Sequence, residues 1–144
     1  MNALEILLVE DNDGDARLIR EILSESTLPY SLNVVSDGIQ AIAFLQQLDG
    51  FSTAPRPDLI LLDLNLPLKN GVEVLDEIKN DTRLQTIAIL LLSNLDESER
   101  KLFNVENLLV DGIVNKPSDL SEFHLVIEAI QKLGFDNSSG QARL

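Results

Sequence analysis

The sequence contains no cysteine and no tryptophan, and it has only 1 histidine among 144 residues. Without cysteine, the chain can form no disulfide, no thiolate metal site and no cysteine nucleophile, although this leaves the compartment open. Basic residues are also scarce, because 11 lysines and arginines stand against 24 acidic residues, giving a formal net charge of −13. A surface this acidic repels nucleic acids and anionic membranes, so we expect neither as a partner.

Long apolar runs are missing as well. No run approaches the roughly 20 residues that a membrane helix requires, and no basic region precedes the apolar start of the chain, as it would in a signal peptide. We therefore expect a soluble cytoplasmic protein. With 44% apolar residues the chain can build one ordinary domain. We assign residues 1–134 to it and expect the polar, Gly/Ser-containing residues 135–144 to form a disordered tail.

Short apolar runs alternate with stretches whose apolar residues have helical spacing. The predicted strands are Glu5–Val9, Leu32–Val35, Leu59–Leu62, Ile87–Leu92 and a weaker one at Gly112–Val114. The helical stripes consist of Ala16, Ile19, Ile22 and Leu23; Ile39, Ile42, Leu45 and Leu48; Val72, Leu75 and Ile78; and Leu120, Phe123, Ile127 and Ile130. A less regular helix is predicted over Glu97–Asn107, capped by Asp96. Five such β/α units predict an α/β fold, in which helices cover both faces of a parallel sheet.

Polar residues follow several of these strands. Glu10 and Asp11 follow the first, Asp63 the third, Ser93 the fourth and Lys116 the fifth. In such sheets ligands bind beyond the carboxyl ends of the strands, so these side chains are expected to converge. Three carboxylates in one place repel each other and call for a hard cation such as Mg²⁺. A carboxylate beside this cation can form an aspartyl-phosphate, while Lys116 and Ser93 bind phosphoryl oxygens.

The ordered segments VEDN, LDLNLPLKNG, LLLSN and VNKP together resemble the signature of the response regulator receiver family, over roughly residues 4–134. The resemblance implies a flavodoxin-like fold with strand order 2-1-3-4-5. It also implies a signalling protein rather than an enzyme, one that accepts a phosphoryl group on Asp63 from a histidine kinase. Mg²⁺ would be held by Asp11, Asp63 and the backbone carbonyl of Asn65, with Glu10 acting through water or from outside the first ligand sphere.

The same resemblance assigns the remaining site residues. Ser93 matches the switch hydroxyl of the family, and Lys116 matches the lysine that precedes a proline. In the family this lysine is joined to the proline by a cis peptide bond, which we expect for Lys116–Pro117. Pro67 and Gly71 match the turn that leads into the third helix.

Two longer segments suggest the partner. VEDNDGDARLIREIL and PRPDLILLDLNLPLKNG look like the small regulators paired with bacterial phytochromes, although similar stand-alone receivers serve other kinases. The expected partner is therefore a sensor histidine kinase, with a phytochrome kinase as one option. No output domain is recognised, so the signal is expected to pass by docking. The face made by the fourth helix, fifth strand and fifth helix would bind a partner or form a homodimer.

Three positions depart from the usual pattern of the family. Ile113 stands three residues before the lysine, where the family usually has an aromatic ring that reports movement of the hydroxyl. Asn94 and Leu95 follow Ser93, where Ala or Gly is common at the first position. We hypothesise that Asn94 narrows access and that Leu95 fails to orient attacking water, which would make the phosphoryl group long-lived.

Some of these residues also fit other interpretations. The run DNDGD has alternating acids like a calcium loop, but Ala16 stands where glycine is needed and Ile22 where the bidentate glutamate belongs. Asp13 and Asp15 instead favour the positive end of the first helix. Ser93 alone is compatible with a simple turn cap. His124 has no second histidine or cysteine with which to bind a metal.

Three rival functions remain. A phosphatase of the haloacid dehalogenase type also uses an aspartate nucleophile and Mg²⁺, but its nucleophile stands on the first strand and Asn65 replaces its second aspartate. A flavodoxin-like electron carrier would need a hydroxyl-rich phosphate loop where Glu10 and Asp11 stand. A degenerate receiver that serves only as an interaction module would not need Asp63, Asp11 and Lys116 together.

Overall fold

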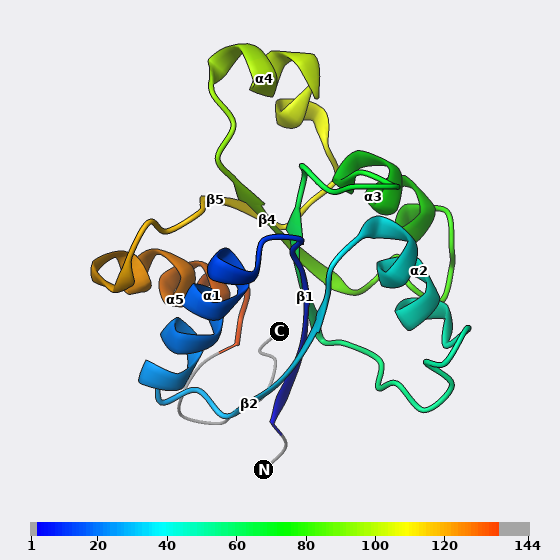
Figure 1. The fold of residues 1–144 in the computed structure, drawn as a ribbon, viewed down its shortest axis with the longest axis horizontal. Coiled ribbons are helices and arrows are strands. Elements are labelled where there is room, and N and C mark those ends of the chain that lie inside the picture. Colours follow the sequence, from blue (N-terminus) through cyan, green and yellow to red (C-terminus); the bar gives the residue numbers. More distant parts are fainter. Residues whose placement is uncertain (1–2, 136–144) are drawn as a thin grey trace.

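The computed structural model describes residues 3–135, in which helices and strands alternate along the chain (Figure 1). The strands are β1 (Leu4–Val9), β2 (Tyr30–Val35), β3 (Leu59–Asp63), β4 (Ala88–Ser93) and β5 (Gly112–Asn115). The α-helices are α1 (Asp13–Glu25), α2 (Gly38–Gln46), α3 (Gly71–Lys79), α4 (Glu97–Leu102) and α5 (Phe123–Lys132), with short 3₁₀ helices η1 (Val105–Asn107) and η2 (Leu120–Glu122). The expected α/β alternation is confirmed.

The five strands form one parallel sheet in the order β2-β1-β3-β4-β5. This is the predicted order. The register aligns the carboxyl ends of the strands, because Val9 pairs with Val35 on one side and with Leu62 on the other. The residues that follow β1 and β3 therefore emerge at the same edge of the sheet.

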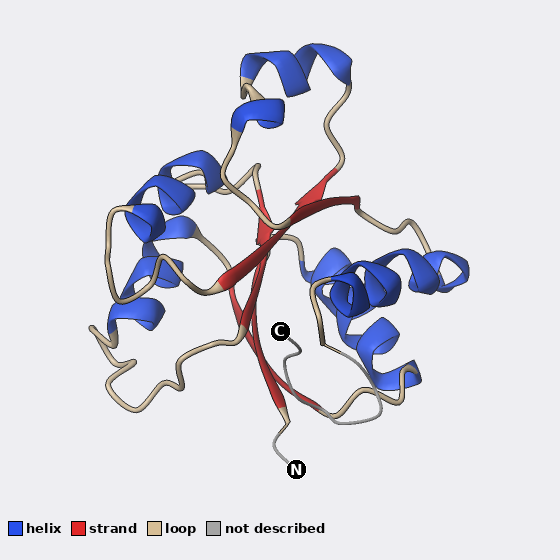
Figure 2. Cartoon of the chain, turned by 180° about the vertical axis from the view of Figure 1, so that it is seen from behind, coloured by secondary structure: helices blue, strands red, loops and turns tan. Residues whose placement is uncertain are grey.

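Helices cover both faces of the sheet, and Figures 1 and 2 show α1 and α5 on one side and α2 and α3 on the other. Alternate residues of each central strand point to opposite faces. Leu7 and Ile60 pack with α2 and α3, whereas Ile6 and Leu61 pack with α1 and α5. Burial on both faces explains why these strands are continuous apolar runs rather than alternating ones.

The fourth helix differs from its prediction. The sequence predicts one helix over 97–107, but α4 ends at Leu102, and η1 follows after a break. Asn104 adopts the left-handed conformation with φ 55°, which interrupts the helical hydrogen-bond ladder. Asp96 caps α4 as predicted, in a capping box with Glu99. No residue of α4 itself is buried, and Figure 1 shows this helix standing beyond the sheet.

Three further expectations can be compared with the structure. The Lys116–Pro117 bond is not cis, because residues 3–135 contain no cis peptide, so this prediction was wrong. Trans is the intrinsically favoured form even before proline, by roughly 0.5–1 kcal/mol. Most of the predicted tail, residues 136–144, lies outside the described residues. Among the described helices, none is long and apolar enough to cross a bilayer.

Candidate functional site

The turn between β1 and α1 brings two acids to the end of the sheet. The Glu10 amide continues the strand by donating to Val35 O at 3.0 Å. Asn12 then caps α1, its side chain accepting from the Asp15 amide at 2.9 Å. The Asn12 amide donates to Glu10 Oε2 at 3.2 Å. The cap and the strand together hold Glu10 and Asp11 at the junction of strand and helix.

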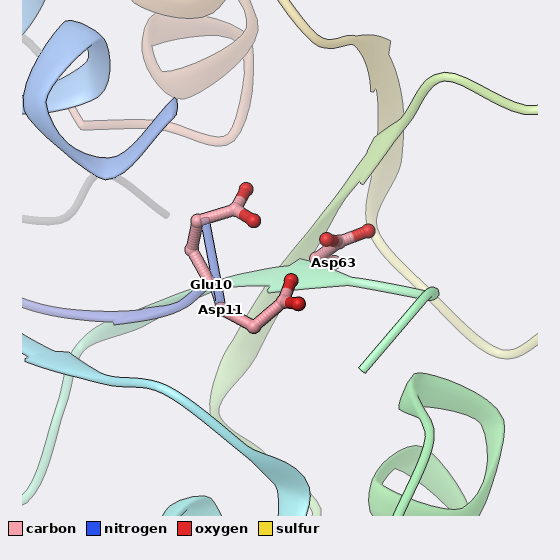
Figure 3. Close-up of side chains that lie close together, drawn as sticks. All are labelled: Glu10, Asp11 and Asp63. Atoms are coloured by element: carbon pink, nitrogen blue, oxygen red, sulfur yellow. The ribbon is translucent and has the colours of Figure 1, made fainter. Parts of the chain in front are cut away.

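Three carboxylates meet at this junction. Glu10, Asp11 and Asp63 each offer an oxygen, and these oxygens lie within 4.8 Å of one another. Figure 3 shows the three side chains close together beside the end of β3. Glu10 is 2% exposed and Asp63 is 3% exposed, whereas Asp11 is open to solvent. Two of the three charges are therefore largely removed from water.

Lys116 is the cation of the site. Its Nζ lies 2.8 Å from Glu10 Oε1, 2.9 Å from Asp63 Oδ2 and 3.2 Å from Asp15 Oδ2. The contact with Glu10 is a close ion pair, and Lys116 also donates hydrogen bonds to Asp63 and Asp15. The chain reaches this position from β5, whose last residues pair with the end of β4.

Burial changes the ionisation of the two partners in opposite ways. Burial raises the pKa of Glu10 to about 7, because Lys116 offsets only part of it while Asp63 adds a further increase. Burial alone would lower the pKa of Lys116, but its contacts with Glu10 and Asp63 outweigh this effect and raise the pKa. The lysine is therefore held charged, and the site binds a proton on Glu10 readily when no other cation is present.

The donor set fits a divalent cation. It consists of carboxylate oxygens, which hard cations such as Mg²⁺ prefer. Glu10 Oε1 is also buried, and it contacts the Lys116 ammonium at 2.8 Å. Glu10, Asp11, Asp15 and Asp63 carry more charge than a single lysine neutralises. Glu10, Asp11 and Asp63 are therefore the residues that could hold a metal.

The loop between β3 and α3 shapes the other side of Asp63. The Asn65 amide donates to Asp63 Oδ1 at 3.1 Å, so both oxygens of this carboxylate take a donor. Two glycines let neighbouring backbone approach the loop. A Cβ on Gly71 would lie 2.5 Å from Asp63 O, and one on Gly38 only 1.9 Å from Lys69 O. Neither position has room for a side chain without movement of the backbone.

Ser93 ends β4 and is 1% exposed. Its hydroxyl accepts from the Leu95 amide at 3.2 Å, the turn-capping arrangement that the sequence left open. Within residues 3–135 this hydroxyl makes no hydrogen bond to Asp63 or Lys116. Asn94 is exposed, and Leu95 is half-buried against the core that packs α2 and α3. Ile113 is also half-buried against this core, paired with Leu91 in the sheet.

The structure therefore brings together Glu10, Asp11, Asp63 and Lys116, as the strand ends suggested. Sequence reasoning missed the contact of Asp15 with Lys116, because Asp15 was interpreted only as a helix-end charge. The available signal was its position in the first turn of α1, shortly after Glu10 and Asp11 at the mouth of the sheet, the edge where the carboxyl ends of the strands meet.

Comparison with known proteins agrees with this geometry. The family model of the response regulator receiver domain matches residues 6–128. The response regulator Rcp1 of Synechocystis sp. is 40% identical over 126 residues, covering 88% of this chain and 85% of its own length.

Two solved structures are similar. The phosphorylated cyanobacterial phytochrome response regulator RcpA is 41% identical with a TM-score of 0.79, covering 92% of this chain and 94% of that one. The Mn²⁺-bound form of Rcp1 is 40% identical with a TM-score of 0.76, covering 90% of this chain and 92% of that one.

The match spans most of the chain and includes every strand end described above. The chain therefore belongs to the response regulator receiver domain family of two-component signalling.

Proposed function

We propose that this response regulator is switched when Asp63 accepts a phosphoryl group from a phosphohistidine of a sensor kinase, in a Mg²⁺-dependent reaction. One observation carries the proposal. The buried Asp63 carboxylate lies at the mouth of the sheet, in hydrogen-bond contact with Lys116 and beside Glu10 and Asp11. The phosphorylated state of RcpA supports it by similarity.

The transfer requires one bond to form and one to break. An oxygen of Asp63 bonds to phosphorus while the P–N bond to the kinase histidine breaks, and the imidazole leaves with the electron pair and takes up a proton. Lys116 offers its ammonium to a phosphoryl oxygen. The Asn65 amide holds the second oxygen of Asp63 and so orients the nucleophile.

Asp11, Asp63 and the backbone carbonyl of Asn65 would hold the cation, and Glu10 would act through water or from outside the first ligand sphere. When bound, the metal neutralises the charge shared by the carboxylates and the incoming phosphoryl group. The all-oxygen donor set supports the choice of Mg²⁺, which is a hard cation. The Mn²⁺-bound form of Rcp1 supports a divalent cation by similarity.

Ser93 and Lys116 would respond to the new charge. The Ser93 hydroxyl gives up the Leu95 amide and turns toward the phosphoryl group, which shifts the segment leading into α4. Ile113 offers no aromatic ring for this relay, so the change passes through the loop after β4. The altered surface of α4, β5 and α5 then docks a partner or a second copy of the chain.

The partner kinase would be of the phytochrome type, and the reaction would take place in the cytoplasm. The support is similarity to two regulators, one of them named for a phytochrome. A purified phytochrome kinase should phosphorylate the wild type and not Asp63→Asn. Transfer from an unrelated kinase at an equal rate would contradict this pairing.

The central test is a titration with beryllofluoride and Mg²⁺, followed by amide chemical shifts. Wild type should shift at residues around Asp63, Ser93 and α4, and Asp63→Asn should not. Asp58→Asn is a matched control, because Asp58 is an exposed acid just before β3 that caps the Glu5 amide and lies away from the mouth. No response of the wild type would exclude the proposed function.

Two further expectations have their own tests. Ultracentrifugation of the phosphorylated protein should show a dimer, and a monomer alone would contradict docking between copies. Leu95→Glu should shorten the lifetime of the phosphoryl group, because a carboxylate there can orient water. An unchanged lifetime would count against the role given to Leu95, and Asn94→Ala tests access in the same assay.

A further inference from the structure

Asp15 makes a contact that the proposed function leaves unexplained. It stands in the first turn of α1, and its Oδ2 accepts a hydrogen bond from Lys116 at 3.2 Å, across 101 residues of sequence. The backbone amide of Asp15 is held by Asn12 Oδ1 at 2.9 Å, so the cap of α1 fixes the residue where it faces the lysine.

A role at the end of the helix does not account for this contact. Asp13 lies in the same first turn and provides the same favourable charge near the positive end of α1. Asp13 has no ion pair with Lys116, whereas Asp15 does. The two aspartates therefore differ in what they contact, although their charge and their helix are the same.

The three acids around Lys116 differ in how far they are buried. The side chain of Glu10 is 1% exposed and that of Asp63 is 5% exposed, but Asp15 is 40% exposed. Asp15 is therefore the partner on the solvent side of Lys116. An ammonium has three N–H donors, and three carboxylates surround this one. A phosphoryl oxygen that binds Lys116 therefore competes with these three carboxylates for the ammonium.

The carboxylate expected to leave Lys116 is the one for which losing the ion pair costs the least free energy. Glu10 would be left as a buried charge without its cation, which is costly. Asp63 is the residue that carries the phosphoryl group. Asp15 can turn into water, where an exposed ion pair is worth little. The exchange of partners at Lys116 is therefore expected to release Asp15.

We propose that Asp15 is a positioning residue for Lys116, which holds the ammonium in the unphosphorylated protein and competes with the phosphoryl group for it. The inference rests on the proposed function. Its consequence is that Asp15 opposes phosphoryl binding, so the native site binds the group more weakly than the other residues alone would allow.

The test compares beryllofluoride affinity in the presence of Mg²⁺, by amide chemical-shift titration, for wild type, Asp15→Asn and Asp13→Asn. Asp15→Asn should bind roughly threefold to tenfold more tightly, from the loss of one partly screened charge. Asp13→Asn should stay within about twofold of wild type, because its charge is removed from the same turn without touching Lys116. The gain for Asp15→Asn should shrink at high salt.

Two further measurements distinguish a positioning role of Asp15 from a purely structural one. The ¹⁵Nζ resonance of Lys116 before addition of beryllofluoride should move in Asp15→Asn and stay in place in Asp13→Asn. Asp15→Glu, which keeps a carboxylate within reach of the lysine, should restore an affinity near that of wild type. Thermal melting of each variant separates these effects from a loss of folded protein, and Asp15→Ser replaces Asp15→Asn if the latter does not fold.

The outcomes distinguish the two proposals. If wild type responds to beryllofluoride but Asp15→Asn binds as wild type does, or Asp13→Asn gains as much, the role of Asp15 is overturned and the phosphorylation of Asp63 stands. If wild type does not respond, both are overturned.

Discussion

The mouth of the sheet and the α4 segment are held in different ways. At the mouth, Glu10, Asp63 and Lys116 are almost fully buried and contact one another directly. In α4 no residue is buried, and Leu102 is 80% exposed. The helix relies on its capping box and on the neighbouring residues Phe103 and Val105, which pack on the core.

This difference indicates that the two regions have different roles in the switch. A site that positions reacting groups must keep them in fixed geometry, which burial and paired charges provide. A segment with few buried contacts opens at low free energy and so responds to small changes nearby. The Ser93 hydroxyl joins the two, because it ends a buried strand and holds the Leu95 amide at the entrance to α4.

The largest effect is expected from removal of Lys116 at the buried mouth of the sheet. Lys116→Met leaves Glu10 and Asp63 without their cation, so the free energy of unfolding should fall by about 3 kcal/mol at pH 8 in the absence of metal. Chemical denaturation measures it. Lys101→Met, at an exposed position of α4, is the control and should change stability by less than about 0.5 kcal/mol. An equal loss of stability in Lys116→Met and Lys101→Met would show that the two regions are not held differently.

The raised pKa of Glu10 predicts a pH dependence of stability. Its pKa is about 7 in the folded protein against an ordinary value of 4.5. Between these values the folded state binds more protons than the unfolded state, so stability decreases as pH rises from 4.5 to 7. The whole change is about 3 kcal/mol at most. Denaturation in EDTA should show this slope in wild type and not in Glu10→Gln; parallel curves would refute it.

Gly38→Ala should disturb the site through its supporting loop. Its Cβ would lie 1.9 Å from Lys69 O, so the loop that follows Asp63 must move, at about 2 kcal/mol. Amide shifts of Asn65 and Lys69 should change, and beryllofluoride binding should weaken. Gly14→Ala serves for comparison, since its nearest neighbour is a side-chain oxygen at 3.2 Å. A normal melting temperature and normal shifts in Gly38→Ala would show that the loop tolerates displacement.

The smallest effect is expected in α4, whose cap can be set against a matched cap on α3. Asp96 and Asn70 each form a capping box, on α4 and α3 respectively. Asp96→Ala should cost about 1 kcal/mol, seen as faster hydrogen exchange in α4 with little change in the melting temperature. Asn70→Ala should instead lower the melting temperature, because α3 is part of the core. If Asp96→Ala destabilises the whole domain equally, α4 is not an independent segment.

Much of the fold could be predicted from local patterns. The apolar runs identified all five strands, and the acids, serine and lysine that follow them identified the mouth of the sheet. Asp96 was recognisable as a cap because short polar acceptors are favoured at that position. The break at Asn104 was not predictable, since Asn is compatible with both helix and left-handed backbone and the choice depends on packing around Val105 and Phe103.

The βα alternation, the family and the residues at the strand ends could be identified from the amino-acid sequence, because they depend on periodicity and on order along the chain. Only the tertiary structure placed Asp15 against Lys116, whereas the trans bond at Lys116–Pro117 and the hydrogen bond of Ser93 to Leu95 were each one of two local geometries that the sequence allows. These depend on distances between segments far apart in sequence or on the choice between two local geometries. Asp15 is the example, because its charge suits the N-terminus of α1 and its side chain also contacts Lys116.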